Sequence, residues 1–226
     1  MPDLTDADVD SMVTPAWDMA KRAIEDGDTD GAMRWIDTAV ARTRSLQEYS
    51  INWLTSLLSF VGRELGEDGV ERALRVTGEE FVRPRRGTGW DSLPASARAK
   101  AIARAMVANG GSCEVGEDDE KIVLSFRCGS GGALIDGGRY DTAGGPYLTL
   151  TEKAGRTFQR DELPVYCSHC AVNNEMQPIE WGGTPTSIEH PPTKPGERCV
   201  HHVYKDPAAI PAAAYVRIGK PPSVGS

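Results

Sequence analysis

The sequence lacks several features that would place it in a familiar class of protein. It has no apolar run near the ~20 residues that a membrane span needs. Its first residues, Met1 to Asp6, lack the basic and then apolar order of a secretory signal. The chain has 25 basic and 33 acidic residues. The resulting net charge of -8 argues against a nucleic-acid-binding surface. We therefore expect a soluble cytoplasmic protein with no membrane or nucleic-acid partner.

Nucleotide-binding motifs and internal repeats are absent as well. The glycine-rich segment from Gly129 to Gly145 matches neither a phosphate-binding loop nor a dinucleotide fingerprint, so no nucleotide is implied. The chain has 226 residues, of which 39% are hydrophobic and 26% charged. That composition excludes a disordered acidic chain, a collagen-like repeat and a coiled-coil rod, and it allows a self-sufficient core.

Helical periodicity dominates the first half of the chain. From about Asp30 to Leu65, apolar residues recur at the spacing of a helix that faces a core. They are Leu46, Tyr49, Trp53, Leu54, Leu57, Leu58, Val61 and Leu65. Shorter helices are expected at 15–26, 67–82 and 92–109, with a break at Pro84 because proline cannot continue a helix. Trp17, Trp35 and Trp53 are interpreted as core of this helical layer.

Strand patterns replace the helical pattern after Gly111. Strands are expected at 113–115, 121–128 and 200–204, with an ordered Pro- and Gly-rich loop at 178–195. We expect an α+β fold, in which an N-terminal layer of about four helices packs on a C-terminal antiparallel sheet that carries a cysteine and histidine metal site. The helical region is assigned to 1–110, the α+β metal-binding region to 111–206 and a Pro-rich tail to 207–226. The first two regions are expected to form one continuous domain.

Cysteine usage is the most informative feature of the sequence. There are five cysteines, an odd number, and structural disulfides are rare in a reducing compartment. Cys167-Ser168-His169-Cys170 is a C-x-x-C segment, which can direct two thiolates at one zinc ion. Cys199 is the natural third ligand, and Cys128, His169, His190 and His201 are candidates to complete the site. An iron–sulfur cluster is less favoured, since the spacing is not that of a ferredoxin. The alternative is a set of buried free thiols.

A second candidate site follows the strand expected at 121–128. Cys128-Gly129-Ser130-Gly131-Gly132 would place a thiol in a cleft as a nucleophile, as a metal ligand or in a plain glycine turn. Glu175, Glu180 and Glu189 flank the cysteine–histidine region. A carboxylate such as Glu175 could serve as a general base beside zinc-bound water, although solvated surface positions are the alternative. Trp90 and Trp181 are candidates to line a pocket, with covering the core as the alternative. Arg83, Arg85 and Arg86 are candidates to bind an anionic substrate or partner, with a solvated linker as the alternative.

The order of these motifs resembles a known bacterial family. From Cys113 to Tyr204 the chain is similar to the group described as L-2-amino-thiazoline-4-carboxylic acid hydrolase-like. It also resembles the 4-vinyl reductase (hydrocarbon-binding) domains, which close with a segment like Gly196-Glu197-Arg198-Cys199-Val200-His201. The resemblance implies site cysteines at Cys128, Cys167 and Cys199. It further implies helices packed on an antiparallel sheet around a small-molecule pocket. The sequence departs from the family pattern where His201 replaces an aromatic residue.

Three functions remain open from the sequence. The first is a zinc-dependent hydrolase or lyase acting on a small polar organic molecule, with one zinc ion. Its metal ligands would come from Cys128, Cys167, His169, Cys170, Cys199 and His201, and its catalytic groups from Cys128, Glu175 and His201. The second is a small-ligand-binding or sensing domain with a structural zinc. The third is a metal-free hydrolase with Cys128 as nucleophile, assisted by His169 or His201. A homodimer is also left open.

Overall fold

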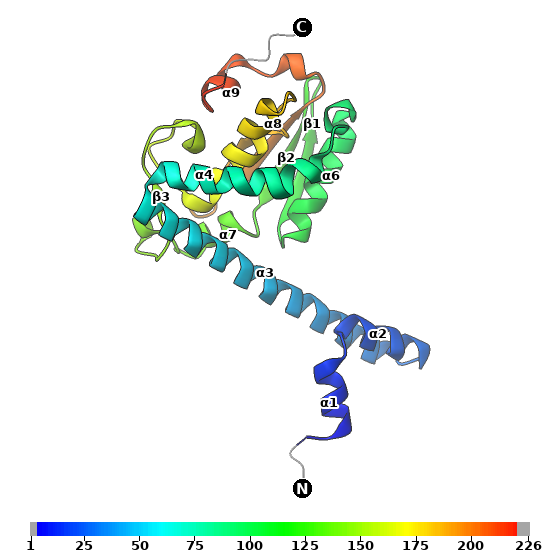
Figure 1. Ribbon diagram of the computed structural model, residues 1–226. Helices are drawn as coiled ribbons and strands as arrows, with labels where there is room; N and C mark the ends of the chain where they lie inside the picture. The colour runs from blue at the N-terminus through cyan, green and yellow to red at the C-terminus, as the bar shows by residue number, and fades with distance from the viewer. Residues whose placement is uncertain (1–3, 221–226) are drawn as a thin grey trace. The chain divides into compact units, whose positions relative to one another are not determined.

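The computed structural model describes residues 4–220 and confirms the α+β class (Figure 1). One antiparallel sheet has the strand order β1 (Ser112–Glu117), β2 (Lys121–Arg127), β6 (Cys199–Tyr204) and β5 (Ile188–His190). Two short strands pair separately, β3 (Thr149–Leu150) and β4 (Leu163–Pro164). Strands β1, β2 and β6 lie where the sequence predicts them. Strand β5 lies in the segment predicted to be a loop.

Helices α1 to α6 come before the first strand of the sheet in the sequence, and shorter helices follow β2 and β6. The longer ones are α1 (Asp6–Val13), α2 (Ala16–Glu25), α3 (Thr29–Leu65), α4 (Glu67–Thr77) and α6 (Ala95–Ala108). Short helices are α5 (Arg83–Arg86), α7 (Gly131–Asp136), α8 (Gln177–Glu180) and α9 (Ala212–Val216), and π-helical turns are η1 (Gly78–Val82) and η6 (Cys170–Met176). Single 3-10 turns are η2 (Trp90–Ser92), η3 (Asp141–Ala143), η4 (Gly155–Thr157), η5 (Val165–Cys167) and η7 (Pro207–Ala209). Over residues 4–220, no helix combines the length and apolar character required to cross a bilayer.

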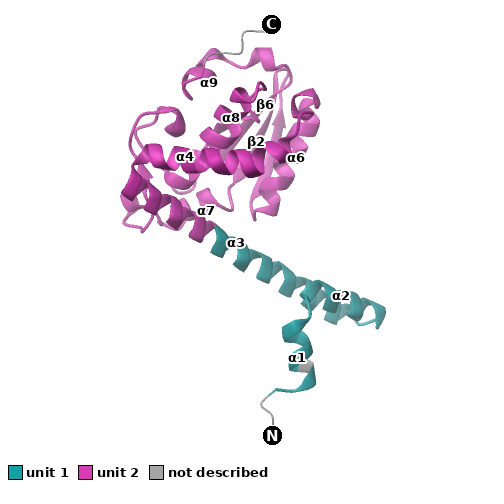
Figure 2. Cartoon of the chain, viewed as in Figure 1, with its two compact units in different colours: residues 1–50 teal, residues 51–226 magenta. Residues whose placement is uncertain are grey.

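The chain divides into two compact units, and the division falls inside α3 (Figure 2). Unit 1 spans residues 1–50 and unit 2 spans residues 51–226. In the described part of unit 1, the fully buried apolar side chains are only those of Ala16, Ala20 and Ala32. Unit 2 holds the sheet and the buried apolar clusters. The predicted boundary between the helical region and the α+β region, at residue 110, falls between α6 and β1. Both elements belong to unit 2.

Helix α6 covers one face of the sheet and forms a core with it. Alternate residues of β2 point into this core, and their partners on β6 do the same, as the period of two in a strand requires. The buried members are Ala95, Ala99 and Ile102 of α6, Ile122, Leu124 and Phe126 of β2, and Cys199 and Val203 of β6. His201 lies opposite Leu124 and is buried on the same face. Cys199 and His201 therefore share one face of β6, as their spacing predicts.

A larger apolar cluster lies between the C-terminal part of α3, helix α4 and the segments that follow β2. Its completely buried members are Val70, Leu150, Leu163, Val165, Ala171, Val172 and Ile218. Ile218 belongs to the predicted tail, of which residues 207–220 are ordered through η7 and α9. Ile218 is completely buried, so this part of the Pro-rich tail belongs to the core of unit 2. Residues 221–226 of the tail lie outside the described residues.

The predicted break at Pro84 is wrong. The chain continues from α4 through the π-helical η1 into α5, which has Pro84 in its first turn. The residues before Pro84 form the wider π-helical turn η1, in which the N–H of Arg83 bonds to the carbonyl oxygen of Gly78, five residues earlier, so this turn accommodates the missing N–H of the proline. The chain turns only after Arg86, where Gly87 has φ +61°. Helix α6 begins at Ala95, with Pro94 at the position before its first turn.

The predicted core face of α3 is only partly correct. Ile51 and Leu58 are buried, 8% and 5% exposed, and Val61 packs against the same cluster. Leu46, Tyr49, Trp53, Leu54, Leu57 and Leu65 are instead exposed. Trp17 and Trp53 are 61% and 59% exposed, so their assignment to the core is wrong. The apolar residues of α3 therefore occupy more than the one face that is buried.

Candidate functional site

One small cavity of about 80 Å³ collects cysteine and histidine side chains from three segments distant in the sequence. The first segment follows β2, the second is the C-x-x-C turn, and the third is β6. The six side chains predicted as metal ligands all lie on the wall of this cavity, namely Cys128, Cys167, His169, Cys170, Cys199 and His201. Glu189 and Asn174 line it as well. Cys113 is half-buried on β1 and does not line it.

Glycines allow the first segment to approach the second closely. A Cβ on Gly131 would lie 2.9 Å from the Cys167 sulfur, and one on Gly132 would lie 2.8 Å from the Cys128 Cβ. A Cβ on Gly129 would lie 2.1 Å from the carbonyl oxygen of Asn109, which is a backbone atom and cannot move aside easily. The glycine run after Cys128 is therefore required by close packing around the thiols.

Cys199, His201 and Glu189 form a linked set across β5 and β6. The Cys199 sulfur lies 3.3 Å from His201 Nε2, and His201 Nδ1 lies 3.4 Å from Glu189 Oε1. The sheet register pairs Glu189 directly with His201, which places both side chains on the face that α6 covers. All three residues are 4% exposed or less. The set has the order thiol, imidazole, carboxylate that nucleophilic catalysis uses.

Ser187 fixes the tautomer of His201. Its hydroxyl donates to Glu189 Oε1 at 3.0 Å, so its oxygen is left to accept from His201 Nδ1 at 3.1 Å. The proton of the neutral imidazole is then on Nδ1, and Nε2 presents its lone pair to the Cys199 thiol. Asn174 donates to the second oxygen of Glu189 at 3.3 Å, which holds the carboxyl group in place. His201 can therefore accept a proton from Cys199.

His169 is oriented in a similar way on the other side of the cavity wall. Its Nδ1 lies 2.6 Å from the carbonyl oxygen of Tyr166, which can only accept, so Nδ1 carries the proton. Its Nε2 lies 3.7 Å from the Cys170 sulfur. Both imidazoles therefore direct an unprotonated Nε2 toward a cysteine sulfur.

Burial keeps the inner thiols protonated. Burial is the largest cause that raises the pKa of Cys167, Cys170 and Cys199, and the charge of Glu189 raises the pKa of all three further. Burial also lowers the pKa of His201, which favours its neutral form. Cys128 is only half-buried, and its sulfur lies 3.2 Å from the Ser130 hydroxyl. The thiol and the imidazole of the linked set are therefore both neutral before any reaction.

The donor types suit zinc, but their arrangement is incomplete. Thiolates and imidazole nitrogens are the ligands that zinc prefers, and a ligating histidine usually gives its other N–H to a carboxylate or carbonyl. His169 does so with the carbonyl of Tyr166, and His201 gives its N–H to the Ser187 hydroxyl. Within residues 4–220, however, no three His, Cys, Asp or Glu side chains form a group that could hold a metal ion. A metal would require the side chains to rearrange.

Glu175 lies behind the cavity and does not line it. Its Oε1 accepts from the backbone N–H of Glu189 at 2.6 Å and from Arg217 Nη2 at 2.5 Å. Burial raises the pKa of Glu175 to about 8. This predicted general base therefore positions β5 and does not face the thiols. His190 lies on the opposite face of the sheet, where its ring packs against His202 at 5.0 Å.

An apolar groove of about 330 Å³ adjoins the cysteine–histidine cavity. The two hollows share Met106, Asn174, Glu189 and His201. The rest of the groove is lined mostly by Phe81, Val82, Trp90 and the outer turns of α6, with Arg85 and Arg86 at its wall. Trp90 therefore lines a pocket, which is one of the two interpretations that the sequence allows. The groove has the size and lining of a small-molecule site.

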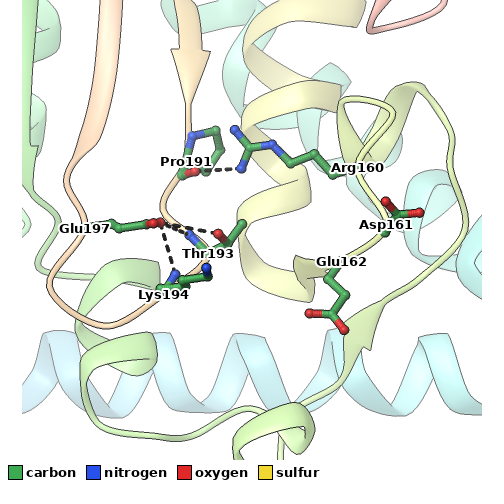
Figure 3. A pocket seen from close by; sticks show the side chains of 7 residues that line it. All are labelled: Arg160, Asp161, Glu162, Pro191, Thr193, Lys194 and Glu197. Atoms are coloured by element: carbon green, nitrogen blue, oxygen red, sulfur yellow. Dashed lines mark hydrogen bonds between the residues drawn. The ribbon is translucent and has the colours of Figure 1, made fainter.

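A third hollow, of about 350 Å³, is open and charged (Figure 3). Arg160 donates to the carbonyl oxygen of Pro191 at 2.7 Å, and Glu197 accepts from the backbone of Thr193 and Lys194. Figure 3 shows Asp161 and Glu162 on the other side of this hollow. The hydrogen bonds of Arg160 and Glu197 hold the loop around Pro191 and Thr193 in place. No thiol or imidazole lines this hollow.

No protein-family model matches this chain, and comparison with curated proteins and with solved structures finds no match either.

Proposed function

We propose that the protein is a thiol-dependent hydrolase that uses Cys199 as nucleophile and His201 as base. The observation that carries this proposal is the linked set of the Cys199 sulfur, the His201 imidazole and the Glu189 carboxyl, with sulfur and Nε2 3.3 Å apart. It keeps the metal-free alternative drawn from the sequence but moves the nucleophile from Cys128 to Cys199, because Cys199 has an imidazole within hydrogen-bond reach.

The reaction follows from the positions of the protons. Sulfur of Cys199 attacks an acyl or imidoyl carbon of the substrate while its proton passes to His201 Nε2. Glu189 and Ser187 stabilise the imidazolium through Nδ1. His201 then protonates the leaving group as the bond to it breaks, and the acyl chain stays on sulfur as a thioester or thioimidate. Water, deprotonated by His201, attacks that carbon and restores the thiol.

The adjoining groove supports an apolar substrate body. Its wall of Phe81, Trp90 and Met106 leads to His201 and Glu189, which are shared with the thiol cavity. A molecule in the groove would place its reactive end beside the linked set. The cavity of about 80 Å³ admits only a small end group. We therefore propose a small organic substrate with an apolar body, rather than the wholly polar molecule expected from the sequence.

A p-nitrophenyl butyrate assay tests this function. The wild-type protein is expected to release p-nitrophenolate and to carry a butyryl group on Cys199, detected by mass spectrometry of the quenched protein. Cys199→Ser should lower the rate at least about 100-fold, whereas the matched control Cys113→Ser, outside the cavity, should keep it. An unchanged rate in Cys199→Ser, or a butyryl group found on Cys128 alone, would overturn the assignment.

A zinc-dependent hydrolase or lyase is the second candidate. The observation that favours it is the orientation of His169 and His201, whose Nε2 atoms both face cysteine sulfurs. Cys167, Cys170 and Cys199 would be the ligands, completed by Cys128, His169 or His201, and zinc would supply polarisation of the substrate or a bound hydroxide. Metal analysis of the purified protein decides between the candidates. One zinc per chain, lost together with activity in Cys167→Ser, favours this candidate over the metal-free enzyme.

A further inference from the structure

Three arginines lie in the short helix α5, and two of them are already balanced by carboxylates. Arg83 donates to Glu79 Oε2 at 2.8 Å and does not line the apolar groove. Arg86 lines the groove, but its guanidinium donates to Asp91 Oδ1 at 2.7 Å and to the carbonyl oxygen of Thr184 at 2.8 Å. The charges of Arg83 and Arg86 are therefore both compensated within unit 2.

Arg85 is the third arginine, and it lines the groove without a carboxylate partner. Its Nη1 donates to the carbonyl oxygen of Phe81 at 3.3 Å, and its guanidinium carbon lies 5.6 Å from the centroid of the Phe81 ring. Because Phe81 lines the same groove, these contacts hold the guanidinium at the wall of the groove. Arg85 has no other hydrogen bond or ion pair within residues 4–220. A guanidinium carries several N–H donors, so most of them remain available for a ligand.

The charges along the groove favour an anion at Arg85. Among the described residues that line it, two carry a guanidinium group, Arg85 and Arg86, and one carries a carboxyl group, Glu189. Glu189 lines both the groove and the cysteine–histidine cavity, whereas Arg85 lines the groove alone. Since Asp91 balances Arg86, the charge of Arg85 is left without a counter-charge at the wall. A carboxylate matches a guanidinium through two parallel hydrogen bonds.

The rest of the groove requires a ligand with an apolar body. Its wall is mostly apolar and includes Phe81, Trp90 and Ile102. Its volume of about 330 Å³ is that of a small-molecule site and exceeds what a carboxylate alone would fill. Arg85 and His201 therefore offer such a ligand two chemically different partners, of which only His201 is shared with the thiol cavity.

We propose that Arg85 binds a carboxylate of the substrate, at the end of the acyl chain remote from the carbon that Cys199 attacks. The substrate class is then an ester or thioester of an apolar acyl chain that ends in a carboxylate. This inference rests on the hydrolase function proposed above and adds the residue that selects the substrate. Arg85 supplies hydrogen bonds and a counter-charge to the bound chain, and it takes no part in proton transfer.

Matched p-nitrophenyl esters test Arg85 through the Michaelis constant. The monoesters of succinic, adipic and suberic acid carry the terminal carboxylate, and the butyrate, hexanoate and octanoate esters have the same chain lengths without it. For at least one length, Arg85→Ala should raise the KM of the charged ester at least about 10-fold more than that of the uncharged ester. The matched control Arg83→Ala removes the same charge from the same helix, outside the groove, and should change both KM values alike. Equal effects of Arg85→Ala on both esters at every length, or the same discrimination lost in Arg83→Ala, would overturn the proposal.

Binding without turnover separates this proposal from the hydrolase function. Calorimetric titration of Cys199→Ser with octanoate and with octanamide compares a charged and an uncharged ligand of one length. Adding Arg85→Ala should weaken octanoate binding at least about 10-fold more than octanamide binding. Since Arg85 is exposed, circular dichroism should show an unchanged fold. If this difference is measured while no ester is hydrolysed, the hydrolase function fails and the carboxylate site stands. Hydrolysis that depends on Cys199, with no charge-dependent effect of Arg85→Ala in either measurement, overturns the carboxylate site alone.

Discussion

The buried carboxyl of Glu175 predicts an unusual dependence of stability on pH. Its side chain is completely buried in η6, and among the described residues its Oε2 has no hydrogen-bond partner. Burial raises its pKa from 4.5 to about 8, against the opposing charge of Arg217. Replacing this residue by glutamine keeps an acceptor for Arg217 and for the Glu189 backbone, and it removes the titration.

The sign follows from where the proton is bound. Between pH 4.5 and 8 the folded chain holds a proton on Glu175 that the unfolded chain has lost. The stabilising contribution is therefore complete below pH 4.5 and is lost as the pH rises toward 8. His190 acts in the opposite direction below pH 6.5, because burial lowers its pKa to about 4. The two effects offset each other in the acid range, so the loss due to Glu175 is visible from pH 6.5 to 8.

The size of this change in the free energy of unfolding follows from the pH interval between 6.5 and 8. At 1.36 kcal/mol for each pH unit, a proton held over 1.5 units changes the free energy of unfolding by about 2 kcal/mol. Urea unfolding at pH 6.5 and pH 8 measures it. The wild-type protein should lose about 2 kcal/mol more over this interval than Glu175→Gln. The control Glu180→Gln, whose partly exposed carboxyl has a lowered pKa, should behave like wild type over this interval. Parallel pH profiles for wild type and Glu175→Gln would refute the reasoning.

Three further predictions concern the thiols and the packing around them. Two of the five thiols, Cys113 and Cys128, should react with Ellman's reagent in the native protein, and all five should react in guanidinium, because the other three are buried. Gly78→Ala should lower the free energy of unfolding by about 1–3 kcal/mol, measured in urea, since its Cβ would lie 1.8 Å from Gln177 Oε1. Phe126→Leu should cost about 1–2 kcal/mol in the same assay, because this ring is completely buried and packs edge-on against His201 at 5.1 Å.

The composition of the candidate cavity could be predicted from the sequence because residue type carries that information. Cysteine and histidine gather in a short part of the chain, and a C-x-x-C turn directs both thiols to one side. The spacing of Cys199 and His201 also predicts a shared face of a strand, since side chains alternate along it. These predictions concern residues two or three positions apart in the sequence, whose relative directions follow from the local secondary structure.

The partner of His201 could not be predicted in the same way. Glu189 reaches it through the register between β5 and β6, which depends on how the chain returns after η6. Strand β5 has only three residues, too few for alternation to be visible, and it lies in a segment rich in proline and glycine. A pairing between strands is a property of the folded sheet. The sequence pattern alone favours Glu175 as the general base, and only the register shows that Glu189 is the carboxylate beside His201.

Helix α3 shows a different limit of sequence patterns. Its periodicity correctly predicts a long helix with apolar positions, and Leu58 confirms that one face packs on a core. The same periodicity also includes Trp53 and Leu57 on the opposite face, because two apolar stripes overlap along one helix. A stripe indicates that a helix buries apolar area, but it does not identify the surface that covers this area. The inner face is filled by the small side chains of Thr55 and Ser59, so the periodicity predicts the helix but not which of its apolar residues are buried.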